Sequence, residues 1–232
     1  MRQNERYVVI EDIDFDEALR YLGYGEKAPD SKTKELLLLC ESRLKKVVDG
    51  KFVYKVFDLM DGQIPNVNFK LEGQAIQRHL KNCEKVIFMC ATLSGGVDLL
   101  IRKMQITGMA EAMITDSLAS AMIEQVCDKA EEVILKDFDG YEHTWRFGLG
   151  YDDFPLAYQK QFLEVLDAPK RIGVCVNQSM MLTPTKSVTC VIGLGHDLQT
   201  STVKSCDMCS FREKCQFRKE GCTCKKTAEC LE

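Results

Sequence analysis

The chain has 232 residues, enough for one large domain or for a domain joined to a small module. Charged residues make up 28%, hydrophobic residues make up 45%, and the net charge is −4. A composition of this kind is typical of a globular protein, and the lack of excess positive charge argues against nucleic acid as a partner. The first 16 residues lack the apolar core of a signal peptide, and no apolar run approaches the roughly 20 residues of a membrane span. We therefore expect a cytoplasmic protein that does not enter a membrane.

Capping residues and apolar spacing predict two helices within the first 50 residues. Asp14 precedes a short amphipathic helix, and the segment Pro29-Asp-Ser31 opens a longer helix that ends near Gly50. β-Branched and aromatic residues then predict a strand over 52–59 and a second strand near 66–71.

The rest of the body alternates between helical and strand-like patterns. The remaining predicted elements are a helix over 74–81, a central strand over 85–91, helices over 97–106 and 110–133, a helix over 155–166, and strands over 172–176 and 187–194. The sequence thus predicts an α/β or α+β domain over 1–203, which ends in a linker over 196–205. A small cysteine-rich module follows at 204–232.

Six of the twelve cysteines lie in the last 27 residues, at Cys206, Cys209, Cys215, Cys222, Cys224 and Cys230. Clustered cysteines in a cytoplasmic protein favour metal or redox roles over structural disulfides. The two residues between Cys206 and Cys209 bring both thiolates to one metal ion. Cys215, with Cys222 or Cys224, would complete a four-thiolate site for zinc or an iron–sulfur cluster. Free thiols or disulfides are the alternative for this tail.

The segment Arg146-Phe-Gly-Leu-Gly-Tyr151 is the strongest candidate for a ligand-binding loop. Two glycines spaced by one residue allow unusual backbone angles and a close approach to a ligand. Arg146 offers a rigid guanidinium fork that suits a carboxylate, and Tyr151 adds an aromatic face with a polar tip. A small amphipathic ligand fits this chemistry, while a connecting loop with a surface arginine is the alternative.

Other candidate sites carry weaker signals. The segment 91–96 ends in Ser94-Gly-Gly96 between a strand and a helix, where a ligand site and a tight turn are both compatible with the sequence. The three histidines, His79, His143 and His196, lack the spacing of a metal site or of a nucleophile–base pair. We expect them to be structural or exposed.

Four blocks together resemble the C-terminal activation domain of cobalamin-dependent methionine synthase, over residues 84–195. The blocks are Val86-Ile-Phe-Met-Cys-Ala-Thr-Leu-Ser-Gly-Gly-Val-Asp98, Asp116-Ser-Leu-Ala-Ser-Ala-Met-Ile-Glu124, Arg146-Phe-Gly-Leu-Gly-Tyr151 and Asn177-Gln-Ser-Met-Met-Leu-Thr-Pro-Thr-Lys-Ser-Val188. The third is similar to the family's Arg-x-x-x-Gly-Tyr loop. The order and spacing of the blocks also agree with the family.

The resemblance implies an α+β fold that is C-shaped, with an antiparallel sheet and flanking helices. It also implies that S-adenosylmethionine binds at Arg146, Gly148, Gly150, Tyr151 and Glu124, with the ligand carboxylate on Arg146. In that family the methyl group of S-adenosylmethionine restores methylcobalamin, while a flavodoxin-type donor supplies an electron. Cobalamin would be carried here by a partner methionine synthase or corrinoid protein, with a flavodoxin or ferredoxin as the electron donor.

Several positions depart from the family pattern. Ser120 stands where the family has a ligand-contacting glutamate, Gln178 replaces another glutamate, and Asp152-Asp153 follow the Gly-Tyr pair in place of a cysteine-containing segment. These departures keep a second hypothesis open: a noncatalytic docking or assembly module of the same fold, which has lost S-adenosylmethionine and has a zinc-stabilised tail.

Overall fold

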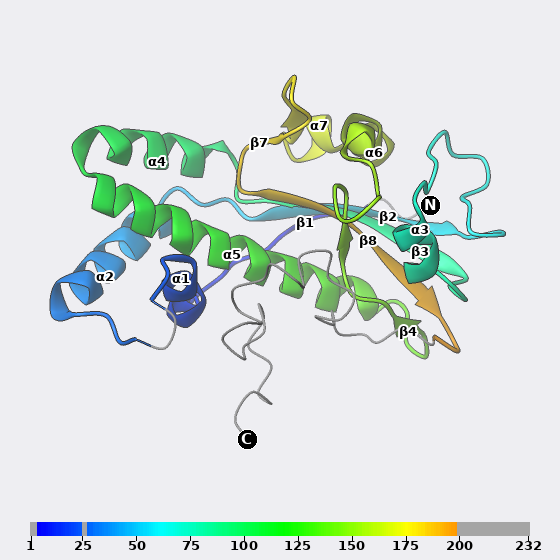
Figure 1. Cartoon of the computed structure of the whole chain (residues 1–232), viewed down its shortest axis with the longest axis horizontal. Coiled ribbons are helices and arrows are strands. Elements are labelled where there is room, and N and C mark those ends of the chain that lie inside the picture. Colours follow the sequence, from blue (N-terminus) through cyan, green and yellow to red (C-terminus); the bar gives the residue numbers. More distant parts are fainter. Residues whose placement is uncertain (1–3, 25–26, 199–232) are drawn as a thin grey trace.

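An antiparallel sheet with helices on both faces forms the centre of the molecule (Figure 1). The structure, a computed structural model, describes residues 4–24 and 27–198. The strands are β1 (Asn4–Tyr7), β2 (Lys51–Asp58), β3 (Lys85–Thr92), β4 (Glu142–His143), β5 (Phe147–Gly148), β6 (Cys175–Val176), β7 (Leu182–Thr183) and β8 (Ser187–Gly195). The helices are α1 (Phe15–Tyr21), α2 (Ser31–Lys45), α3 (Gln74–His79), α4 (Gly95–Thr107), α5 (Met109–Leu135), the 3-10 turn η1 (Leu156–Tyr158), α6 (Gln159–Leu166) and α7 (Ala168–Arg171).

The main sheet has six strands, in the order β1-β2-β3-β8-β4, and the short strand β5 also pairs with β8. β3 lies in the middle and pairs antiparallel with β2 on one side and with β8 on the other. Seven of its eight residues are buried, which explains why its sequence is almost continuously apolar. The predicted central strand is therefore confirmed. β6 and β7 form a separate two-stranded ribbon.

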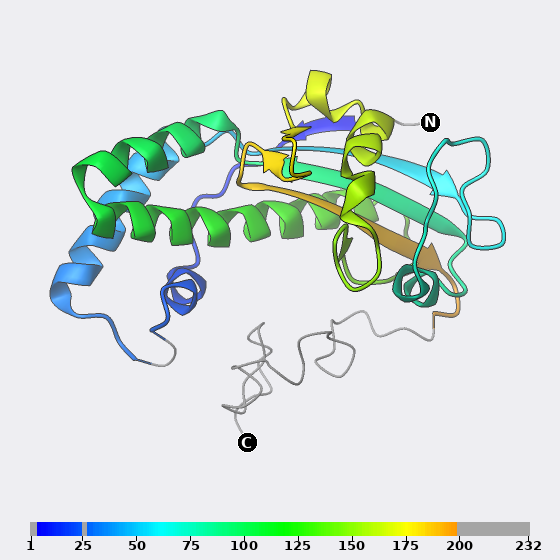
Figure 2. The ribbon, with the colours of Figure 1, turned by 45° about the horizontal axis from the view of Figure 1, so that its top comes forward.

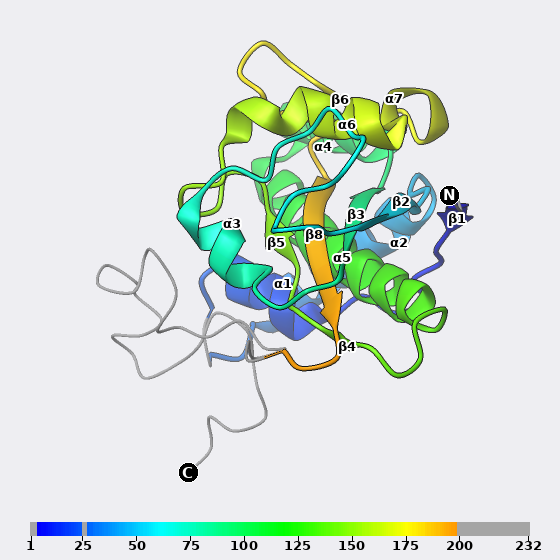
Figure 3. The same cartoon turned by 90° about the vertical axis from the view of Figure 1, so that its right-hand side faces the viewer.

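The two faces of the sheet have separate cores because successive side chains of a strand point to opposite faces. Ile87, Met89 and Ala91 of β3 pack with α1, α2, α4 and α5. Phe88 and Cys90 pack on the other face with the α6 region and with Phe69. Viewed from the side, α6 and α7 lie on one face of the sheet and α5 lies on the other (Figure 3).

Helices α2, α4 and α5 extend beyond one end of the sheet as a helical arm (Figures 1 and 2). α5, with 27 residues, runs from this arm back across the sheet face and has 13 buried residues. The predicted caps are confirmed for the first two helices, because the side chains of Asp14 and Asp30 accept hydrogen bonds from the backbone N–H groups of Glu17 and Thr33. The predicted separation of the helices over 97–106 and 110–133 is confirmed as well, because Gly108 lies between α4 and α5.

One predicted strand is wrong, one is much shorter than predicted, and four strands were not predicted, namely β1, β4, β5 and β7. Residues 66–71 form no strand: Asn66 has a positive φ of 62°, and Phe69 and Leu71 bury their side chains from an irregular segment. The apolar run at 172–176 forms only the two residues of β6, because Ile172 is the C-cap of α7 and Gly173 has a positive φ of 71°. The edge strand β1 lies in a segment too polar to predict a strand.

No helix within the described ranges is both long and apolar enough to cross a membrane. The cysteine tail over 204–232 lies outside the described residues. Its boundary and its metal ligands Cys206, Cys209, Cys215, Cys222 and Cys224 therefore stay predictions.

Candidate functional site

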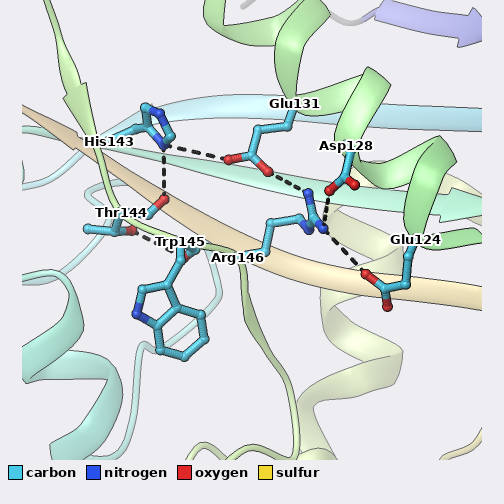
Figure 4. Close-up of polar contacts among 7 residues, drawn as sticks. All are labelled: Glu124, Asp128, Glu131, His143, Thr144, Trp145 and Arg146. Atoms are coloured by element: carbon cyan, nitrogen blue, oxygen red, sulfur yellow. Dashed lines mark hydrogen bonds and ion pairs between the residues drawn. The ribbon is translucent and has the colours of Figure 1, made fainter. Parts of the chain in front are cut away.

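Strand alternation directs Arg146 toward α5. Phe147 pairs with Val191 of β8, which fixes the register of the loop on the sheet. Trp145 and Phe147 pack on the α3 side, with ring centroids 4.6 and 4.9 Å from the ring of His79. Arg146, between them, therefore points to the opposite face, and Figure 4 shows Trp145 turned away from α5 while the guanidinium faces it.

Three carboxylates of α5 surround the guanidinium of Arg146 (Figure 4). Nη1 donates to Glu131 Oε2 at 2.6 Å, and Nη2 donates to Asp128 Oδ1 at 2.6 Å and to Glu124 Oε2 at 3.3 Å. The residue spacings of four and three put these acidic side chains on one face of the helix. We call Arg146 and these three carboxylates the arginine cluster.

The arginine cluster has a buried side and a solvent-facing side. The side chains of Arg146 and Glu131 are 12% and 16% exposed, whereas those of Glu124 and Asp128 are 43% and 56% exposed. Burial alone would lower the pKa of Arg146, but the neighbouring Cys127, Glu131 and Asp128 raise it above its ordinary value. The guanidinium thus stays charged, contacts a mostly buried carboxylate through Nη1, and contacts two half-exposed carboxylates through Nη2.

His143 extends the cluster at the buried end. Its Nδ1 lies 3.5 Å from Glu131 Oε1 and 3.3 Å from the carbonyl oxygen of Thr144. The side-chain hydroxyl of Thr144 accepts a hydrogen bond from the Gly193 backbone N–H at 2.9 Å. The segment between β4 and β5, which carries Arg146, is therefore tied to β8 just before the loop begins.

The glycines after Arg146 form a tight turn under the ring of Tyr151. The Tyr151 N–H donates to the Gly148 carbonyl at 3.2 Å, and the Gly150 N–H donates to the Phe154 carbonyl at 2.9 Å. Gly150 has a φ of +85°, which favours glycine. A Cβ at Gly148 would lie 2.7 Å from two ring carbons of Tyr151, so only glycine leaves room for that ring. Tyr151 is 45% exposed, and its ring centroid lies 6.0 Å from that of Phe147.

Asp153 has a role that the sequence did not reveal. Its carboxylate accepts hydrogen bonds from the backbone N–H groups of Gln74 and Ala75, at 2.6 and 2.9 Å, and so caps the start of α3. These hydrogen bonds lower the pKa of Asp153. No local sequence signal marks this cap, because 78 residues separate Asp153 from Ala75. The aspartate that departs from the family pattern thus helps to fix the loop on α3.

Ser120 lies in a second polar group, one turn of α5 before Glu124. Lys186 donates to Ser120 Oγ at 2.8 Å and pairs with Asp116 Oδ1 at 2.9 Å. The second and fourth sequence blocks therefore meet in space. The first and fourth blocks also meet, because Thr185 donates to Asp98 from its N–H at 2.9 Å and from its hydroxyl at 2.6 Å.

The other candidates have structural explanations. A Cβ at Gly96 would lie 2.6 Å from the Val47 carbonyl oxygen, so close packing requires glycine in the segment 91–96. His79 is buried, and burial lowers its pKa to about 4, an effect partly offset by the Trp145 backbone. His196 pairs with Glu84 at 2.7 Å. Over the described residues, no group of three or more metal-ligating side chains is arranged to hold a metal ion.

One hollow on the described surface lies at the start of α3 and does not include the arginine cluster. It has a volume of about 710 Å³ and is open to solvent. Residues at the start of α3 and Asp153 line it, namely Glu72, Gly73, Gln74, Gln77, Arg78 and Asp153. Because the carboxylate of Asp153 already occupies the N–H groups at the start of this helix, the chemistry of the hollow is less specific than that of the cluster.

Comparison with known proteins supports the fold. No family model matches the sequence, and no curated protein matches it. Among solved structures, the chain is similar to the crystal structure of the MetH reactivation domain bound to AdoHcy, with a TM-score of 0.67 and 14% sequence identity. The alignment covers 97% of this chain and 87% of that chain. The predicted mixed fold with an antiparallel sheet is thereby confirmed: this chain has the fold of the MetH reactivation domain.

Proposed function

We propose that this protein binds S-adenosylmethionine at the Arg146–Tyr151 loop and supports the reductive methylation of cobalamin on a partner protein. The partner would be a methionine synthase or another corrinoid protein. The fold supports the proposal, since the similar reactivation domain was solved with AdoHcy, the product that S-adenosylmethionine leaves after methyl transfer. The arginine cluster supports the assignment of the proposed binding site to particular residues.

The geometry of Arg146 suits the amino-acid end of S-adenosylmethionine. Glu131 holds Nη1 on the buried side, so the guanidinium keeps its orientation when a ligand binds. The longest contact, 3.3 Å from Nη2 to Glu124, joins the guanidinium to a half-exposed side chain. A ligand carboxylate takes the place of Glu124 on Nη2, and the released carboxylate of Glu124 then accepts hydrogen bonds from the ligand ammonium. Tyr151, at the end of the same loop and 45% exposed, would offer an aromatic face to the rest of the ligand.

The proposed reaction at the partner's cobalamin needs one electron and one methyl group. In the reaction that this function implies, a flavodoxin or ferredoxin would supply one electron to the partner's cobalamin. The cobalamin would then receive the methyl group from the sulfonium, with the carbon–sulfur bond broken and S-adenosylhomocysteine left as the product. The role of this chain is to bind and orient the methyl donor.

Calorimetric titration with S-adenosylmethionine tests the binding step. The wild-type chain should bind the ligand, and Arg146→Met should remove binding because the guanidinium is lost. Arg102→Met is the matched control, since Arg102 lies exposed on α4, away from the arginine cluster. If the wild-type protein gives no heat at millimolar ligand, the proposal fails.

A second function has support from the same contacts. Three carboxylates already satisfy Arg146, and Lys186 already satisfies Ser120, as expected of a docking module that has lost its ligand. In that case the cysteine tail would be a zinc-stabilised docking element, whereas an electron relay would require an iron–sulfur cluster. Analysis of iron, sulfide and zinc in anaerobically purified full-length protein distinguishes these two hypotheses for the cysteine tail. Zinc without sulfide, together with absent ligand binding, would favour the docking module.

A further inference from the structure

The arginine cluster holds more negative charge than its arginine can balance. One guanidinium faces the carboxylates of Glu124, Asp128 and Glu131, which leaves two negative charges in excess. The neighbouring ion pairs do not offset them, because Arg20 pairs with Glu17 and Lys186 pairs with Asp116. His143, 3.5 Å from Glu131, adds a positive charge only when its ring is protonated. The excess therefore persists over this face of α5.

We infer that the carboxylates of Asp128 and Glu131 make the site selective for the cationic sulfonium of S-adenosylmethionine over the uncharged thioether of S-adenosylhomocysteine. This inference rests on the proposed function. The two ligands share an ammonium, a carboxylate and an adenosine, and differ only in the methyl group and its positive charge. S-adenosylmethionine thus has a net charge of about +1 at neutral pH and its product has a net charge near zero, as follows from their ordinary ionisation.

The selectivity does not depend on how the ligand lies in the site. A cation anywhere within several ångströms of the two excess charges is attracted, while a neutral sulfur atom is not. Glu131 is mostly buried, so water screens its charge less than that of an exposed carboxylate. At distances of about 6–8 Å and a dielectric constant close to that of water, the attraction corresponds to about tenfold tighter binding of S-adenosylmethionine. The spent product would then leave more readily than the methyl donor.

Titration with three ligands tests the inference on the full chain. The ligands are S-adenosylmethionine, S-adenosylhomocysteine and sinefungin, an analogue that carries an amine-bearing carbon in place of the methylated sulfur. We expect sinefungin to bind like S-adenosylmethionine because both are cationic. Asp128→Asn and Glu131→Gln should each lower the affinity ratio of methyl donor to product about threefold. Raised salt should lower the ratio in the wild-type protein.

The control is Asp167→Asn. Asp167 has the left-handed φ of 57° that asparagine also tolerates, and it lies at the end of α6, across the sheet from α5. This variant should leave the ratio unchanged. Equal affinity for the two ligands, or an unchanged ratio in both cluster variants, would overturn the inference while leaving the proposed function intact. Absence of binding by every ligand would overturn both.

Discussion

Replacement of Arg146 by methionine should destabilise the protein by about 2 kcal/mol. Methionine keeps most of the apolar stem of the arginine, so the loss comes from the charge and its hydrogen bonds. Glu131 is mostly buried and would lose a partner at 2.6 Å, which costs about 1–2 kcal/mol. Asp128 and Glu124 are half exposed, so water replaces their partner and each adds only a few tenths of a kcal/mol.

Urea unfolding of a double-mutant cycle measures this effect. For a domain of this size, about 2 kcal/mol lowers the melting temperature by about 4–8 °C. In a Glu131→Gln background the same Arg146→Met change should cost about 1 kcal/mol less, because the buried carboxylate is already neutral. A cost below about 0.5 kcal/mol, or an equal cost in both backgrounds, would refute the reasoning that Glu131 anchors the guanidinium.

Three further predictions concern the loop and its support. Asp153→Asn should cost about 1 kcal/mol at neutral pH by weakening the cap of α3. The folded-state pKa of Asp153 is lowered. The difference in unfolding free energy between the wild type and Asp153→Asn, measured with urea, should therefore shrink as the pH falls below the ordinary carboxyl pKa of about 3.9. His79 has a folded-state pKa of about 4, so the unfolded chain alone takes up a proton between about pH 6.5 and pH 4. As the pH falls through that window, the wild type should lose about 1.4 kcal/mol of unfolding free energy per pH unit relative to His79→Leu. Equal pH dependence of the unfolding free energy in the two proteins would contradict the buried neutral histidine. Gly150→Ala should cost about 1–2 kcal/mol in thermal unfolding because of its φ of +85°, whereas Gly95→Ala, in open space, should be neutral.

Local patterns in the sequence predicted the elements that depend on local chemistry. The capped helices α1 and α2, the break at Gly108 and the central strand β3 all have signals within a few residues. The wrong strand at 66–71 had the right composition, but a strand also needs a partner, and this segment buries Phe69 and Leu71 without one. The elements that failed are therefore those decided by tertiary packing.

The residues of the candidate site also divide into those with a local sequence signal, which were predicted, and those placed by tertiary packing, which were missed. Arg146 and the two glycines were predicted from their own chemistry, and the structure places Glu124 beside Arg146. Asp128 and Glu131 were missed, although their spacing on an otherwise buried helix is visible in the sequence. What the sequence did not contain was the strand register that turns Arg146 toward that helix. Asp153 was missed for the same reason, since it caps a helix far away in the chain.

A final prediction separates a structural role of the arginine cluster from a binding role. One buried carboxylate is enough to hold a guanidinium, and further carboxylates repel one another. Asp128 is 56% exposed, so its contact with Arg146 contributes little to stability. If the cluster exists to bind a cation, Asp128→Asn should leave the free energy of unfolding within about 0.5 kcal/mol of the wild type, or raise it, while it weakens S-adenosylmethionine binding. Chemical denaturation and calorimetry on the same preparation measure both quantities. A variant that loses stability by more than about 1 kcal/mol and keeps its affinity would show that the third carboxylate serves the fold.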